Sequence, residues 1–304
     1  MKSRGLPRNV VVYGLLLIVA IVAALFGTSN GRILGVTAVD KVAPTTSATP
    51  VNPVDAQPAP TLFKATDIVP ISPVLTREYA RAALSVDDFY ASQPAGGAVD
   101  DAAFSRWAAR QLPLAPSAAT RAAERFQRAD MSRSGKRDLA ARWLSLHGCR
   151  DVWTSYVVEQ QRFRAADDQV ASASELDAVL DLAARIATAA HKQFAGEGEP
   201  ALAEPCAARA PAPATCGCSF PSAAAAMSAA ARTYLAGLEP RESRQYAWME
   251  RQVDLAQVYL GRELPSDVEA GGYIGYLVGR YFLASRGYPE PPAPTATTAA
   301  ATVR

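Results

Sequence analysis

The feature of this sequence that most constrains its fold is a helical hydrophobic period that runs through most of its middle. Apolar residues recur at spacings of three and four, and no long stretch alternates apolar with polar residues as a half-buried strand does. Proline and glycine separate several of the periodic stretches, as helix breakers do. The pattern predicts an all-α domain with helices at Thr76–Ala91, Asp100–Leu112, Ser117–Asp130, Arg137–Leu146, Val152–Arg164, Ser174–Phe194, Ser222–Leu238, Arg241–Leu260 and Ser266–Ser285.

The N-terminus has the pattern of a membrane anchor. Lys2, Arg4 and Arg8 precede an uncharged run, Val10–Phe26, which as a helix spans about 25 Å, near the lower limit for crossing a bilayer. A cleaved signal peptide is the alternative, although its apolar stretch is usually shorter and no clear small-residue cleavage site follows. We expect residues 1–27 to be the anchor, with the basic end in the cytoplasm and the rest of the chain outside.

Two segments of low complexity flank the helical pattern. Residues 28–73 become rich in proline, alanine and threonine, and residues 288–304 have the same character. Such compositions cannot build a core and favour extended or disordered chain. We therefore expect a linker at 28–73, one helical domain at 74–287 and a disordered tail at 288–304, a domain size that a chain of 304 residues accommodates.

Charge and cysteine content exclude several functions. The net charge is only +2, so no global field favours nucleic acid, and we expect no nucleic-acid partner. Outside the cytoplasm, cysteines form disulfides that persist, and one or two bridges with open pairing are expected among Cys149, Cys206, Cys216 and Cys218. The only histidines, His147 and His191, show no zinc-ligand spacing with the cysteines, so no structural metal and no cofactor are expected.

Three segments carry the functional argument. They read KQFAGEGEP at Lys192–Pro200, SFPSAAAA at Ser219–Ala226, and AQVYLGRELPSDVEAGGYIG at Ala256–Gly275. In order and spacing they resemble the K-x6-R-P, P-S-G-H and S-R-x5-H-x3-D motifs of the phosphatidic-acid-phosphatase type 2 and vanadium haloperoxidase superfamily, most closely its bacterial class A non-specific acid phosphatases. Each fragment alone is weakly specific, and the three together are much more so. The resemblance covers residues 174–287.

The resemblance implies a phosphate site from which most of the reactive groups are missing. In active relatives one histidine attacks phosphorus, an aspartate orients it, a second histidine protonates the leaving oxygen, and a lysine and two arginines hold the phosphate. The positions that match are Lys192, Pro200, Ser222 and Asp267. The positions that depart are Glu199 and Gln257 for the two arginines, Ala224 for the acid histidine and Glu263 for the nucleophile.

The departures reverse the charge of the implied site. Lys192 now faces Glu199, Glu263 and Asp267, so the formal charge falls from about +2 to about −2, which opposes phosphate binding by several kcal/mol. We therefore expect a catalytically inactive protein with a binding or assembly role towards an unknown protein or small-molecule partner. The alternative is a divergent phosphomonoesterase or lipid phosphatase in which Lys192, Ser222, Glu263 and Asp267 still act.

The acidic positions also allow two other interpretations. Glu263 can be a solvent-facing charge ahead of a helix that Ser266 caps, with Asp267 in its first turn. Alternatively, Glu199, Glu263 and Asp267, with Glu197, can form an acidic cleft for a divalent cation or a basic partner segment, a role that Lys192 would oppose.

The remaining features are expected to be structural. Ala270–Leu283 is predicted to be a small-residue packing face. The two histidines are expected at the surface or at helix ends. The basic set Arg121, Arg125, Arg128, Arg133, Lys136 and Arg137 is expected to be a solvated face. The core is expected to include Trp143, Trp153, Trp248 and Tyr246.

Overall fold

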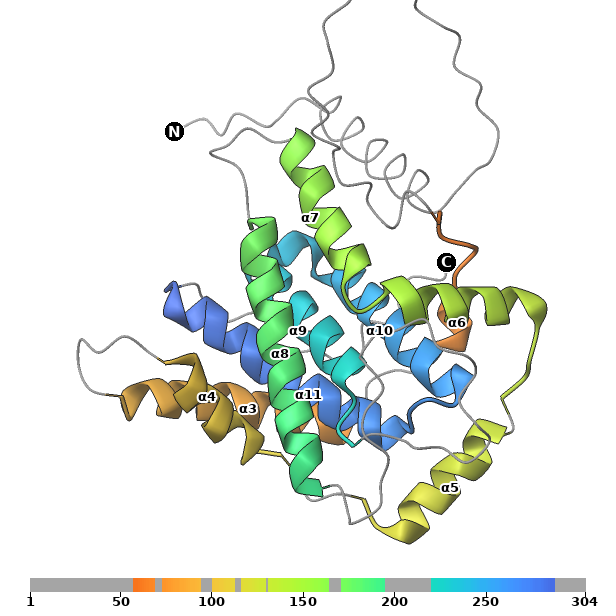
Figure 1. Cartoon of the computed structure of the whole chain (residues 1–304), viewed down its shortest axis with the longest axis horizontal. Helices are drawn as coiled ribbons and strands as arrows, with labels where there is room; N and C mark the ends of the chain where they lie inside the picture. The colour runs from red at the N-terminus through yellow and green to blue at the C-terminus, as the bar shows by residue number, and fades with distance from the viewer. Residues whose placement is uncertain are drawn as a thin grey trace, which may run out of the picture. The chain divides into compact units, whose positions relative to one another are not determined.

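The computed structural model describes residues 57–68, 73–93, 100–112, 116–129, 131–163, 171–194 and 220–287. These ranges contain helices and no strand, which confirms the all-α prediction for them (Figure 1). All nine predicted helices are present, with ends that differ by a few residues. Their bounds are α3 Pro73–Ala91, α4 Asp101–Ala109, α5 Ala118–Ala129, α6 Gly135–His147, α7 Asp151–Phe163, α8 Ala173–Phe194, α9 Ala223–Leu238, α10 Ser243–Leu260 and α11 Pro265–Ser285.

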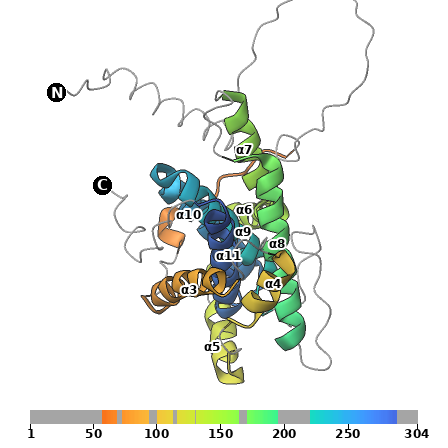
Figure 2. The ribbon, with the colours of Figure 1, turned by 90° about the vertical axis from the view of Figure 1, so that its left-hand side faces the viewer.

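Helix α9 is the centre of the core. All its residues except the last are buried, because α8, α10 and α11 surround it (Figure 2). The packing against α11 is so close that a Cβ at Gly271 would lie 2.2 Å from the Ser222 carbonyl oxygen, and one at Gly275 would lie 2.3 Å from the Ala226 carbonyl oxygen. Glycines four residues apart fall on one helix face. The predicted small-residue packing face on Ala270–Leu283 is thereby confirmed.

Helices α6, α7 and α10 supply aromatic side chains to the core. Trp143, Trp153 and Tyr246 are buried as predicted, whereas Trp248 is only half-buried. Cys149, which follows α6, is buried and disulfide-bonded, while the other three cysteines lie outside the described residues.

Both histidines lie in the last turns of their helices, but they are buried rather than at the surface. Each has a partner that accounts for its burial. His147 Nδ1 lies 2.8 Å from an Asp151 carboxylate oxygen, and His191 Nδ1 lies 3.1 Å from the Phe220 carbonyl oxygen. Of the two expected placements, the helix end is therefore confirmed and the surface is not.

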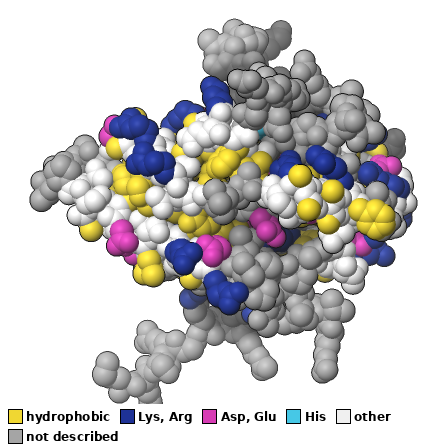
Figure 3. Space-filling model, turned by 90° about the horizontal axis from the view of Figure 1, so that it is seen from below, with side chains coloured by type: hydrophobic (Ala, Val, Ile, Leu, Met, Phe, Trp, Pro, Cys, Tyr) yellow, Lys and Arg dark blue, Asp and Glu magenta, His cyan; other side chains and the backbone are white. Residues whose placement is uncertain are grey.

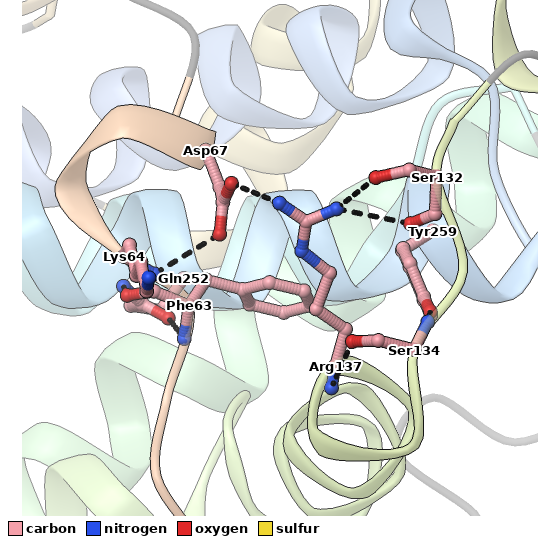
Figure 4. Close-up of polar contacts among 8 residues, drawn as sticks. All are labelled: Phe63, Lys64, Asp67, Ser132, Ser134, Arg137, Gln252 and Tyr259. Atoms are coloured by element: carbon pink, nitrogen blue, oxygen red, sulfur yellow. Dashed lines mark hydrogen bonds and ion pairs between the residues drawn. The ribbon is translucent and has the colours of Figure 1, made fainter.

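Residues 62–68, at the end of the predicted linker, belong to the same compact unit as the helices. The Gln252 side chain on α10 accepts from the Phe63 amide at 3.0 Å and donates to the Phe63 carbonyl at 2.9 Å (Figure 4). The Phe63 ring packs edge-on against Tyr259, and Asp67 forms an ion pair with Arg137. This stretch of the chain is therefore held against α6 and α10.

Within the described ranges, no helix is both long enough and apolar enough to cross a bilayer. The anchor expected at residues 1–27 and the tail expected at 288–304 lie outside those ranges.

Candidate functional site

The implied phosphate-site positions meet where α9 begins, α10 ends and α11 begins, a region called the junction below. Ser222 is the N-cap of α9, and its hydroxyl accepts from the Ala225 amide at 3.2 Å. Its own amide donates to the Asp267 carbonyl at 2.9 Å. The second and third motifs are therefore joined by a direct backbone hydrogen bond.

The end of α10 directs Glu263 into the protein. Gly261 adopts a left-handed conformation with φ 75°, which suits glycine and closes the helix. The amides of Arg262 and Glu263 then donate to the Gln257 carbonyl at 3.1 and 3.4 Å. Glu263 is only 7% exposed, so the interpretation of a solvent-facing charge is wrong. Glu263 is buried because the chain after Gly261 folds back so that its amide bonds to the Gln257 carbonyl.

Asp267 is completely buried, with 0% exposure. Helix α11 begins at Pro265 with Leu264 as its N-cap, so the expected cap at Ser266 is wrong. Asp267 does lie in the first turn, as predicted, and its Oδ2 accepts from the Leu264 amide at 2.9 Å. A carboxylate is favourable at this end of a helix, where free amides and the helix dipole are positive.

Helix α5 supplies two charged side chains that the sequence did not assign to the site. Arg121 Nη1 lies 2.8 Å from Asp267 Oδ1, and the guanidinium is largely buried. Glu124 accepts from the Ser266 amide at 3.1 Å and from its hydroxyl at 2.7 Å. The prediction of a solvated face is therefore wrong for Arg121. The spacing of Arg121 and Glu124 on one helix face was the available signal, but it did not identify their partners.

The orientation of α5 is the reverse of that of an ordinary surface helix. Its charged face carries Arg121 and Glu124 towards α11, while Ala122, Ala123 and Phe126 are exposed, Phe126 by 71%. Seen from below, hydrophobic and basic side chains stand side by side where Figure 1 places α5 (Figure 3). Apart from Arg121 and Glu124, which are partly buried, its described side chains are exposed, so polar contacts to the junction hold this helix.

The electrostatics of the junction differ from the count made on the motifs alone. Burial raises the pKa of Asp267, while the Leu264 amide and the Arg121 guanidinium lower it. Burial lowers the pKa of Arg262, which Glu263 opposes, and the Arg262 guanidinium donates to Ser145. Two guanidiniums thus accompany the carboxylates of Glu124, Glu263 and Asp267. Three carboxylates against two guanidiniums leave a formal charge of about −1 at the junction, compared with about −2 from the motifs.

The other implied positions do not all join the junction. Ala224 is buried in the first turn of α9, and its methyl group can neither donate nor accept a proton. Lys192 is exposed on the last turn of α8. Glu197, Glu199 and Pro200 lie outside the described residues. Within the described part of the chain, no group of three histidine, cysteine or acidic side chains is arranged to hold a metal ion.

No model of a known protein family, no curated protein and no solved structure matches this chain.

Proposed function

We propose that this chain is a membrane-anchored helical protein, related to the phosphatidic-acid-phosphatase type 2 superfamily, that has no phosphatase activity and acts in binding or assembly. Residues 1–27 anchor it in a bacterial inner membrane, and the helical domain lies in the periplasm. The basic residues that flank Val10–Phe26 support this orientation. The disulfide at Cys149 supports a location outside the reducing cytoplasm.

The observation that carries the proposal is the environment of Asp267. In active relatives the matching aspartate orients a nucleophilic histidine. Here Oδ1 is paired with Arg121 and Oδ2 with the Leu264 amide, so both oxygens are engaged by other groups. The nucleophile position is a buried carboxylate, Glu263, and Ala224 provides no proton donor for a leaving oxygen. These groups support a stable helix junction rather than phosphoryl transfer.

One observation favours the alternative of a divergent phosphomonoesterase or lipid phosphatase. Arg121 brings a guanidinium to the position beside Asp267, and an arginine is well suited to bind phosphate. In that case Glu263 would attack phosphorus as a carboxylate and displace the ester oxygen, which takes its proton from water, and a second water would then hydrolyse the acyl-phosphate. This mechanism requires the Arg121–Asp267 pair to open for the substrate.

The deciding experiment measures hydrolysis of an aryl phosphate by the full-length, detergent-solubilised protein between about pH 4 and pH 8. We expect no turnover above that of the Glu263→Gln variant, because the proton donor and the phosphate clamps are missing. Glu242→Gln, on a different segment, is the matched control. Turnover that disappears in Glu263→Gln but persists in Glu242→Gln would support the hydrolase. Micromolar binding of phosphate or vanadate by calorimetry would also contradict the proposal.

A further inference from the structure

A second group of charges lies in the middle of the helical core, away from the helix ends that form the junction. Its members come from α9 and α10 and are called the core charge cluster: Ser228, Arg232, Glu250, Arg251 and Asp254. Ser228 and Arg232 are four residues apart on α9, and Glu250 and Asp254 are four apart on α10, so each pair lies on one helix face. Arg232 is 6% exposed, Glu250 2% and Asp254 7%.

The ion pairs of the cluster are incomplete. Arg232 Nε lies 3.6 Å from Glu250 Oε2, which is too long for a hydrogen bond, and Arg251 Nη1 lies 3.2 Å from Asp254 Oδ2. Each of the five residues keeps one buried atom without a hydrogen-bond partner. These atoms are Ser228 Oγ, Arg232 Nε, Glu250 Oε2, Arg251 Nη2 and Asp254 Oδ1. Donors and acceptors are both present, a combination that water satisfies and that a simple anion or cation does not.

The balance of charge bears on Asp254. Arg232 and Arg251 provide two positive charges, and Glu250, Asp254 and the exposed Glu269 of α11 provide three negative charges. The Tyr79 hydroxyl of α3 also faces the cluster, and burial raises its pKa, so it stays neutral. With all three carboxyls ionised, one negative charge is in surplus. Asp254 keeps its buried Oδ1 without a donor, so its negative charge is only partly compensated, and such a charge is costly in a buried place.

We propose that the core charge cluster is an internal site for water and for one exchangeable proton, which Asp254 holds at neutral pH. Burial raises the pKa of Asp254 to about 8, Glu250 and Glu269 raise it as well, and Arg251 and Arg232 lower it. The unfolded chain, in which an aspartate titrates near its ordinary value of about 4, releases this proton at much lower pH.

The sign of the resulting pH dependence follows from this difference. Because the folded protein binds the proton more tightly than the unfolded chain, Asp254 favours folding at acidic pH, and this contribution is lost as the pH rises through the folded-state value of about 8. The site faces α3 through Tyr79, whose hydroxyl lies 2.6 Å from where a Cβ of Gly272 would be. Ionisation of Asp254 therefore weakens a region where α3, α9, α10 and α11 meet.

The test is the melting temperature of the full-length protein in detergent from about pH 6 to about pH 9. We expect the wild-type value to fall by roughly 5 °C, and the fall to be absent in Asp254→Asn, which imitates the protonated carboxyl. Asp88→Asn, an exposed aspartate of α3, should behave like the wild type. A fall of wild-type size that persists in Asp254→Asn would overturn the proposal.

A second variant keeps the test decisive if Asp254→Asn does not fold. Glu250→Gln removes a neighbouring negative charge and should lower by about one unit the pH at which the fall levels off, which reports the folded-state pKa of Asp254. An unchanged levelling-off pH would contradict the proposal, because Glu250 is one of the groups that raise the pKa of Asp254. A crystal structure of the wild-type protein should show ordered water bonded to at least two of the five unpartnered atoms, and a dry cluster would refute the hydration part of the proposal.

Discussion

The junction and the core charge cluster both contain buried carboxylates and guanidiniums, but they differ in how completely protein groups hydrogen-bond to the carboxylates. At the junction, the completely buried Asp267 receives a hydrogen bond on each oxygen, from Arg121 and from the Leu264 amide. In the core charge cluster, Glu250 and Asp254 are also buried, and each keeps an unpartnered oxygen. The difference teaches that burial alone does not determine what a charge contributes. The partners that the protein supplies also matter, because a buried group that the protein leaves unpaired must either keep its desolvation cost or bind water.

The first prediction removes the cation that is paired with Asp267 at the junction. Arg121→Met should lower the free energy of unfolding by about 4 kcal/mol, because it leaves the Asp267 carboxylate buried without its cation. Urea denaturation followed by circular dichroism measures the loss. Arg125→Met, on an exposed position of the same helix, should change stability by no more than about 0.5 kcal/mol. Equal losses in the two variants would show that α5 has no specific contact with the junction.

The second prediction concerns the incomplete ion pair of Arg232 and Glu250 in the core charge cluster. Arg232→Met alone should cost about 3 kcal/mol, since Glu250 then loses its counter-charge. The double variant Arg232→Met with Glu250→Leu should instead be near wild-type stability, because it removes both desolvation costs. Urea denaturation of these two variants and of Glu250→Leu alone gives the coupling energy. If the double variant is less stable than the single one, the pair is a net stabilising interaction and the contrast with the junction fails.

The third prediction tests the helix contact that positions both regions. Gly275→Ala should cost about 2 kcal/mol despite the better helix propensity of alanine, because its Cβ would meet the Ala226 carbonyl at 2.3 Å. Gly135→Ala is the matched control, since a Cβ there has nothing within 4 Å. It should be neutral or slightly stabilising. Thermal unfolding of the two variants compares them directly, and a neutral Gly275→Ala would mean that α9 and α11 can separate freely.

The fourth prediction concerns Gln252, a neutral side chain next to Arg251. Its oxygen and its nitrogen both hydrogen-bond to the backbone of Phe63. Gln252→Ala removes both bonds to Phe63 and should cost only about 1 kcal/mol, because residues 62–68 can then turn to solvent. Proteolysis near Phe63 should become faster, whereas Gln245→Ala, an exposed position of α10, should leave the rate unchanged. Unchanged cleavage in Gln252→Ala would show that other contacts hold this segment.

Much of the site's backbone followed from local sequence patterns. The period of three and four located each helix, and the proline and serine before α9 marked its start, because capping and helix breaking act over a few residues. Asp267 in a first helical turn was predictable for the same reason. The burial of Glu263 was not, because it depends on a turn that folds back onto the Gln257 carbonyl. Arg121 was missed because its partner is 146 residues away.

The sequence by itself determined that this chain forms helices, where they lie to within a few residues, and which face of α11 carries small residues, since these properties depend on neighbours within one or two turns. Only the tertiary structure decided which charges meet. A charged face such as that of α5 has the same pattern whether it faces water or a buried carboxylate. The choice depends on the desolvation and pairing energies of groups brought together from distant parts of the chain.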